Sequence, residues 1–231
     1  MGTFNVGLGK FDWINTLICP SRFMMSMALK SGISPERLVV IPNSIDETTV
    51  TPSREDGAYY LYLGRLSREK GILTLIEAFT TLSVPLVIAG DGPLRTACEE
   101  KADNAANIRL VGRLEGAELS DCISRSRCLI VPSEWYENAP MVALEAAASG
   151  KAIIAARIGG IPEIVLDGRT GLLFEPGMAE DLRDRVRQME ESAGKRKAFG
   201  LNARSLIEAE FSLSRHYDRL LDAYVQARES A

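Results

Sequence analysis

Two acidic residues stand eight positions apart in a mostly apolar segment of this 231-residue chain. The segment is WYENAPMVALEAAASG, residues 135–150, and the acids are Glu137 and Glu145. An unpaired buried carboxylate is costly, so such a group normally shifts its pKa or finds a partner. The candidate roles are two structural ion pairs, an acid/base couple, or contacts to a polar ligand.

A second short stretch, GRLSREKG, residues 64–71, would place two of its cations, Arg65 and Lys70, at the mouth of the predicted sheet. Gly64 lets the backbone turn after the apolar run YYLYL, and Arg65 and Lys70 follow before a helix that the pattern predicts over 71–82. The N–H groups and dipole of a helix start add to the positive field. The stretch therefore suits a diphosphate, and a solvated basic loop is the alternative.

Two more glycine-containing turns follow predicted strands. The sequence GDGP at 90–93 is typical of an ordinary strand-to-helix turn, with Pro93 near the first helical position. In the longer segment 159–177, Gly159 and Gly160 would let a ligand approach the backbone closely. Neither a G-x-G-x-x-G fingerprint nor a P-loop is present, which disfavours nicotinamide cofactors and ATP-type phosphoryl transfer.

A nucleotide sugar would account for the two carboxylates. Pro140 near the first helical position puts Glu137 just before a helix and Glu145 in its second turn. A carboxylate accepts hydrogen bonds from the vicinal hydroxyls of a sugar or a ribose. The helix start between the two acids can hold phosphate oxygens. A pair of structural ion pairs remains the alternative for this segment.

The elements that must position these residues alternate along the chain. Near-continuous Val/Ile/Leu runs separated by helical patterns indicate a parallel sheet covered on both faces, hence a doubly wound α/β fold. From about 178 onward the pattern is helical. The expected strands are 16–19, 38–41, 59–63, 85–90, 107–111, 128–131, 152–155 and 170–173, and the expected helices are 22–31, 71–82, 93–104, 117–125, 140–149, 179–191, 195–209 and 213–228.

A polar stretch at 46–57, with Pro52 and Gly57, is predicted to be a linker. The segment before it holds about two strands and one helix, too little to bury a core alone. We therefore interpret this segment as a remnant or an edge of a neighbouring domain.

Composition excludes some classes of partner and site. The net charge of -4 gives no support for nucleic acid as a partner. Cys19, Cys98, Cys122 and Cys128 form no C-x-x-C pair and no metal-like cluster with His216, so buried free thiols in a reducing compartment are expected. With no signal peptide or spanning run visible, a cytoplasmic protein is expected, and peripheral membrane contact stays open.

Several motifs together resemble one enzyme family. GRLSREKG, IAGDGP, VGRL, PSEWYENAPMVALEAAASGKAIIA, GGIPEIVLDGRTGLLFEPG and FSLSRHYDRLLDAY occur in the order seen in the retaining GT-B glycosyltransferases called family 4 or group 1. The similarity covers about residues 14–229. It implies a Rossmann-like, nucleotide-sugar-binding domain at 53–209. It also implies that 1–52 is the end of an N-terminal, acceptor-side domain plus the hinge, and that the helix in 210–231 packs back toward that end.

The resemblance also implies roles for individual residues. Arg65 and Lys70 would bind the donor diphosphate and, with Glu137 on the transferred sugar, form the catalytic set, while Glu145 would contact the ribose. Neutralising the leaving group with fixed cations needs no metal ion and no further cofactor. The remaining implied binding residues are Gly64, Gly112, Arg113, Leu114, Asn138, Ala139, Pro140 and Met141.

The sequence departs from the family in two places. The usual P-N-G-[IV]-D hinge reads PNSID, with Ser44 in place of the turn glycine. Most of the family's N-terminal domain, which carries the acceptor site, has no counterpart in these residues, and His216 matches no catalytic position. We therefore expect a donor-binding half that needs an N-terminal-domain partner or self-associates, with a saccharide or lipid-linked acceptor.

Two other functions compete with the glycosyltransferase. A non-catalytic nucleotide-sugar-binding module, or one subunit of a split enzyme, would fit the same donor residues. A nucleotide-sugar 2-epimerase shares the architecture, but its chemistry needs further carboxylates and histidines that this chain lacks.

Overall fold

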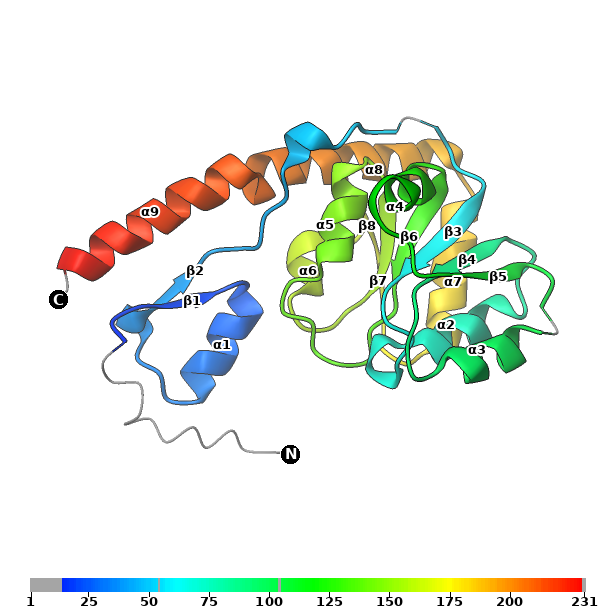
Figure 1. The fold of residues 1–231 in the computed structure, drawn as a ribbon, viewed down its shortest axis with the longest axis horizontal. Helices are drawn as coiled ribbons and strands as arrows, with labels where there is room; N and C mark the ends of the chain where they lie inside the picture. Colours follow the sequence, from blue (N-terminus) through cyan, green and yellow to red (C-terminus); the bar gives the residue numbers. More distant parts are fainter. Residues whose placement is uncertain (1–13, 54, 104, 230–231) are drawn as a thin grey trace.

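The computed structural model describes residues 14–53, 55–103 and 105–229, so residues 1–13 of the expected first domain lie outside it. Figure 1 shows a larger α/β lobe and a smaller lobe that carries the first two strands. The chain crosses between the lobes twice, once after β2 (Leu38–Val40) and once where α8 (Ala193–Leu206) leads into α9 (Leu213–Glu229).

A parallel sheet of six strands forms the larger lobe, in the order β5-β4-β3-β6-β7-β8. Each strand lies where the sequence predicts one, which confirms the doubly wound parallel sheet. The strands are β3 (Tyr59–Leu63), β4 (Leu86–Ala89), β5 (Ile108–Gly112), β6 (Ser126–Val131), β7 (Ala152–Ala156) and β8 (Gly171–Phe174).

Helices cover both faces of this sheet, which is why its strands are apolar at nearly every position. Along β3, Tyr60 and Tyr62 enter one core cluster while Leu61 and Leu63 enter the other. One face is covered by α2 (Ile72–Phe79), α3 (Arg95–Ala102) and α7 (Ala179–Glu190), and the other by α4 (Gly116–Ser124), α5 (Met141–Ala148) and α6 (Ile161–Ile164). Helix α8 (Ala193–Leu206) contributes to both clusters.

Short helical pieces were not predicted from the sequence. They are α6 and the 3₁₀ turns Pro35–Arg37, Glu47–Thr49 and Arg68–Lys70, whereas the π-helical turn Ile207–Phe211 overlaps the end of the helix expected over 195–209. One to two turns are too few to show a 3.6-residue period, so apolar periodicity does not reveal them.

The strand order reverses between β3 and β6. From β3 the chain builds β4 and β5 on one side, then returns to add β6, β7 and β8 on the other. The loops that leave β3 and β6 therefore diverge toward opposite faces of the sheet. In open parallel sheets, ligands bind in the crevice at such a switch point.

The smaller lobe consists of β1 (Leu17–Cys19), α1 (Arg22–Lys30) and β2 (Leu38–Val40). No residue of α1 is buried. An isolated β-bridge between Ile45 and Ser212, and a 2.8 Å contact from His216 Nδ1 to the Pro42 carbonyl, tie the lobe to the start of α9 (Leu213–Glu229). His216 thus has a structural contact at the hinge.

Ser44 fits its position without strain. Throughout the described residues, every positive φ belongs to a glycine, so Ser44 adopts an ordinary backbone conformation. The hinge of this chain therefore does not need the glycine that the related motif carries.

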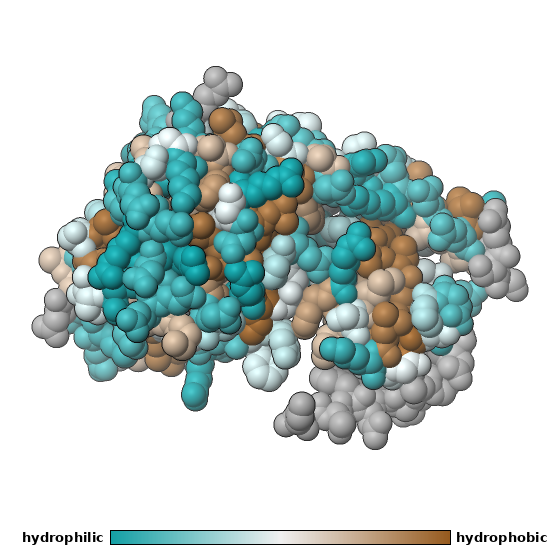
Figure 2. Space-filling model, turned by 180° about the vertical axis from the view of Figure 1, so that it is seen from behind, coloured by the Kyte–Doolittle hydropathy of each residue, from teal (hydrophilic) through white to brown (hydrophobic). Residues whose placement is uncertain are grey.

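Apolar side chains remain exposed on the smaller lobe and on α9. Figure 2 shows hydrophobic surface on the smaller lobe beside the arm of α9. Exposed large apolar residues of β1 and α1 include Ile18, Met24, Met27 and Leu29, and those of α9 are Leu213, Tyr217, Leu221, Tyr224 and Val225. Phe23 and Leu220 are half-buried.

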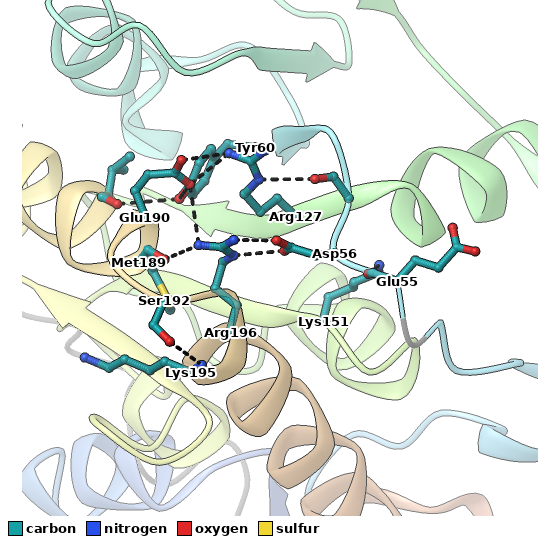
Figure 3. Close-up of polar contacts among 12 residues, drawn as sticks. Glu55, Asp56, Tyr60, Arg127, Lys151, Met189, Glu190, Ser192, Lys195 and Arg196 are labelled. Atoms are coloured by element: carbon teal, nitrogen blue, oxygen red, sulfur yellow. Dashed lines mark hydrogen bonds and ion pairs between the residues drawn. The ribbon is translucent and has the colours of Figure 1, made fainter.

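A network of charged side chains attaches the linker to the amino-terminal end of the sheet (Figure 3). Arg196 forms a bidentate pair with Asp56, and Arg127 pairs with Glu190 at 2.8 Å. The buried Lys151 ammonium donates to the Glu55 carbonyl at 3.2 Å. These contacts lie at the amino ends of β3, β6 and β7, opposite the switch-point loops.

All four cysteines are free and buried, as the sequence predicts. Burial raises the pKa of each thiol, so none is poised as a nucleophile. Within the described residues, no helix is long and apolar enough to cross a membrane.

Candidate functional site

Two loops at the switch point carry the predicted chemistry. The cation loop, residues 64–71, leaves β3, and the carboxylate loop, residues 132–140, leaves β6. Their backbones touch, because a Cβ on Gly71 would lie 1.8 Å from the Pro132 carbonyl oxygen. Gly71 also has a φ of 67°, so both the close approach to Pro132 and the positive φ require a glycine there. The amide of Glu134 also donates to the Glu69 carbonyl at 3.0 Å.

A cavity of about 270 Å³ lies between these loops. Its wall includes seven of the predicted binding and catalytic residues and part of the first turn of α5. These seven residues are Gly64, Arg65, Lys70, Glu137, Ala139, Pro140 and Met141, and Val142 extends the wall along the helix. The amides at the start of α5 have no intrahelical partners, so this end of the cavity is electropositive.

Glu137 is already paired within the protein. Its Oε1 lies 2.5 Å from Lys70 Nζ and accepts a hydrogen bond from the Ser133 hydroxyl at 2.9 Å. The Glu137 side chain is 16% exposed and the Lys70 side chain 37%, so the pair faces the cavity without being sealed from solvent. The ion-pair interpretation of this acid is therefore correct, and it does not exclude a ligand at the same atoms.

Glu145 has no such partner. Across the described parts of the chain, no hydrogen bond or ion pair engages its carboxylate, and burial raises its pKa. It lines a second cavity of about 630 Å³. A half-buried carboxylate that faces a cavity and has no protein partner is free to accept from a ligand.

The two cavities adjoin, because Leu63, Gly64, Arg65 and Val142 line both. Arg113 and Leu114, predicted near the base, line the second cavity with Glu145. Arg113 is held by Glu115 at 2.7 Å, and both side chains are largely exposed. Gly112 lines neither cavity, but its carbonyl accepts from Gly90 N at 2.7 Å.

Asn138, like Gly112, lines neither of these two cavities. It lines a third cavity, of about 330 Å³, between the smaller lobe and α6. Ala139 lines both this cavity and the first one, so the third cavity meets the site at that residue. Neither Gly159 nor Gly160 lines the first two cavities; Cβ atoms there would collide with the backbone of Glu137 and Asn138.

Sequence reasoning missed several residues of the site. Ser133 binds Glu137, and the Tyr62 hydroxyl donates to the Arg65 carbonyl at 2.7 Å, which shapes the cation loop. The turn 90–92, interpreted as an ordinary turn, lines the second cavity. Its place at the carboxyl end of β4, beside β3, was the available signal.

Comparison with known proteins adds independent findings. The profile of the family described as Glycosyl transferases group 1 matches residues 44–206. The chain is 30% identical over 190 residues to an uncharacterized glycosyltransferase of Methanocaldococcus jannaschii, covering 81% of this chain and 53% of that protein. It is 30% identical over 228 residues to the lipopolysaccharide 1,2-N-acetylglucosaminetransferase of Salmonella typhimurium, covering 85% and 58%. The chain thus spans about half the length of these curated relatives.

Solved structures share the fold at low identity. Anabaena HepE in complex with UDP and glucose superimposes with a TM-score of 0.83 at 20% identity, over 91% of this chain and 63% of that one. A glycosyltransferase from Rickettsia africae gives a TM-score of 0.85 at 20% identity, over 98% and 68%. The fold is therefore the Rossmann-like half of a GT-B protein, with a helical C-terminus.

Proposed function

The chain belongs to the glycosyl transferases group 1 family, and we propose that it is the donor-binding half of a retaining glycosyltransferase of family 4. In this proposal it binds a nucleotide sugar, and the sugar passes to a saccharide or lipid-linked acceptor. UDP and glucose are bound in the related Anabaena structure, so UDP-sugars are the first donors to consider.

One observation carries the proposal: two cations and two carboxylates meet around adjoining cavities at the switch point of the sheet. Arg65 lines both cavities, Lys70 and Glu137 line the first, and Glu145 lines the second. A solvated basic loop would give no reason for an unpartnered carboxylate to sit beside it.

The diphosphate would bind between Arg65, Lys70 and the start of α5. Both cations and the amides of the helix start would stabilise the charge that develops on the departing nucleoside diphosphate. Because these groups supply the positive charge from the protein itself, the proposed mechanism requires no metal ion.

Glu137 would contact the hydroxyls of the transferred sugar, and Glu145 those of the ribose. Ser133 holds Glu137 from the protein side, which leaves its other oxygen available for the sugar. The main chain at 138–141 would line the sugar–phosphate region, and 112–114 would lie near the base.

We also propose the domain division at residues 52 and 209 and a location in the cytoplasm, where buried thiols stay reduced. The residues before the linker would then belong to an acceptor-side domain. The apolar side chains exposed on α1 and α9 would contact the rest of that domain.

Calorimetry with UDP, ADP and GDP and their nucleosides tests the diphosphate assignment. Arg65→Ala and Lys70→Ala should each weaken binding of the preferred diphosphate about tenfold or more, since a charge-assisted hydrogen bond contributes about 1.5–3 kcal/mol. Nucleoside binding should change far less. Lys101→Ala, on the exposed side of α3, is the matched control. Equal losses for diphosphate and nucleoside would remove the assignment.

A second candidate function uses the same donor residues around the two adjoining cavities: the chain would hold a nucleotide sugar as a non-catalytic module or as a subunit of a split enzyme. Turnover assays on the purified chain separate these functions. Sustained transfer to an added acceptor at about 1 s⁻¹ or faster by this chain alone would exclude the non-catalytic module.

A further inference from the structure

Glu163 joins the larger lobe to the smaller one. One carboxylate oxygen accepts from the Arg22 amide and the other from the Phe23 amide, both at 2.9 Å. These are the first two residues of α1, whose amides have no partner within the helix. A carboxylate is the best partner for this end of a helix, because it also interacts favourably with the dipole.

The segment that carries Glu163 also holds the carboxylate loop. Gly160 N donates to the Glu137 carbonyl at 2.7 Å. A Cβ at Gly159 would lie 2.3 Å from the Glu137 carbonyl oxygen, and one at Gly160 would lie 2.1 Å from that of Asn138. Only glycines permit this contact, so α6 and the carboxylate loop form one packed unit.

A second contact joins the same two parts. The Phe23 ring lies on the Tyr136 ring, with centroids 5.1 Å apart, and Tyr136 in turn contacts Trp135 at 5.7 Å. Trp135 and Tyr136 are 66% and 54% exposed, and the Phe23 ring covers part of this otherwise exposed segment of the loop. Tyr136 directly precedes Glu137 in the chain.

The near end of α1 meets the larger lobe at Glu163 and at Tyr136. The bridge at Ile45 and the His216 contact attach the hinge to the start of α9, and no residue of α1 is buried. Loss of the Glu163 carboxylate would leave two amides unpaired and would let α1 withdraw from the carboxylate loop.

We propose that Glu163 is a positioning residue, which clamps α1 onto the carboxylate loop and thereby holds Tyr136 and Glu137 in place for the donor sugar. This inference rests on the proposed function and adds to it a residue outside the two cavities. The third cavity is lined by Arg22 and Glu163. It would then be the junction that opens when the Glu163 carboxylate no longer binds the amides of α1.

The test compares Glu163→Gln with Glu118→Gln, an exposed acid in the first turn of α4. Hydrogen exchange is measured at the amides of 22–24 and of 135–139, and binding of UDP and UDP-glucose is measured by calorimetry. Glu163→Gln should speed exchange in both segments by roughly fivefold or more. It should reduce the UDP-glucose affinity severalfold while the UDP affinity stays unchanged, and Glu118→Gln should change neither.

Phe23→Leu provides a second perturbation that leaves the carboxylate in place. It should speed exchange at 135–139 and weaken UDP-glucose binding, with the amides of 22–24 still protected. In Glu163→Gln, exchange could become faster only at 22–24 while the preference for UDP-glucose over UDP stays unchanged. That result would show that Glu163 is only a local helix cap, and it would overturn the proposal. Should the wild-type chain bind no nucleotide, the proposed function fails, and exchange at 135–139 still decides whether the clamp exists.

Discussion

Lys70 Nζ lies 2.5 Å from Glu137 Oε1, across the junction of the loops that follow β3 and β6. Each group therefore neutralises the other in the place where a diphosphate and a sugar would meet. A diphosphate that binds Lys70 must share the ammonium with this carboxylate. Under the proposed function, the pair would couple binding of the two halves of a nucleotide-sugar donor.

Glu137→Gln should affect binding of the diphosphate and binding of the sugar differently. Without the carboxylate, Lys70 can turn fully to a diphosphate, so UDP binding should stay equal or become tighter by about twofold to fivefold. The affinity gained from the sugar should be lost, because Gln binds sugar hydroxyls less strongly than a carboxylate does. Calorimetry with UDP and UDP-glucose measures both. A tenfold loss of UDP affinity would contradict the pair as described.

Glu145→Gln should stabilise the protein in the absence of a nucleotide. Burial raises the pKa of Glu145, so the folded state holds its proton to higher pH than the unfolded state does. Its contribution to stability is therefore greatest below the unfolded pKa and falls as pH rises through the raised folded value. At neutral pH, Gln removes the free-energy cost of burying an ionised carboxylate, and we expect Tm to rise by roughly 1–3 °C.

The same substitution should weaken ribose recognition. Binding of UDP to Glu145→Gln should fall by about tenfold, while binding of the 2′,3′-dideoxy analogue should change little. Calorimetry at pH 7.5 with both nucleotides and thermal melts between about pH 4 and 8 give the two readouts. A variant that loses both stability and dideoxynucleotide binding would show that Glu145 has a structural role instead.

The Arg196–Asp56 pair at the linker should contribute to the loss of unfolding free energy at acid pH. A hydrogen bond from Arg196 lowers the pKa of Asp56, so this carboxylate stabilises the fold above its unfolded pKa. That stability is lost as pH falls through the lowered folded value. Asp56→Asn removes the bidentate partner of the buried Arg196 guanidinium, which keeps the longer 3.8 Å ion pair with Glu190, and should cost about 2–3 kcal/mol at neutral pH.

Urea unfolding from pH 7 to pH 2 measures this loss. The wild type and Asp56→Asn should differ most at neutral pH and converge in acid. Asp184→Asn, at an exposed pair on α7, is the control and should change the free energy of unfolding by about 0.5 kcal/mol or less. A constant difference at every pH would show that the loss does not come from ionisation of Asp56.

The sheet and the two cavities were accessible from sequence because each depends on local signals. Runs such as YYLYL predict β3 at its observed bounds, since a strand covered on both faces is apolar throughout. The rule that ligands bind at the carboxyl ends of strands then placed Arg65, Lys70 and Glu137 around one cavity.

Contacts between distant segments were not accessible in this way. Nothing in the spacing of Lys70 and Glu137 predicts that they touch, because the register of the two loops is set by the packing of Gly71 against Pro132. The roles of Gly159 and Gly160 were misjudged for the same reason. Their missing side chains make room for the protein's own backbone at 137–138 and not for a ligand.

The exposed apolar side chains of α1 and α9 predict self-association of the isolated chain. Met24, Met27, Leu221 and Tyr224 are 36%, 37%, 45% and 66% exposed, as expected for surfaces that pack against something further. Light scattering should show a mass above 25.3 kDa that rises with concentration. Leu221→Lys with Tyr224→Lys should restore the monomer, whereas Leu201→Lys, at an equally exposed leucine of α8, should not. A stable wild-type monomer at high concentration, with both ends protected from hydrogen exchange, would show that these ends complete a core by themselves.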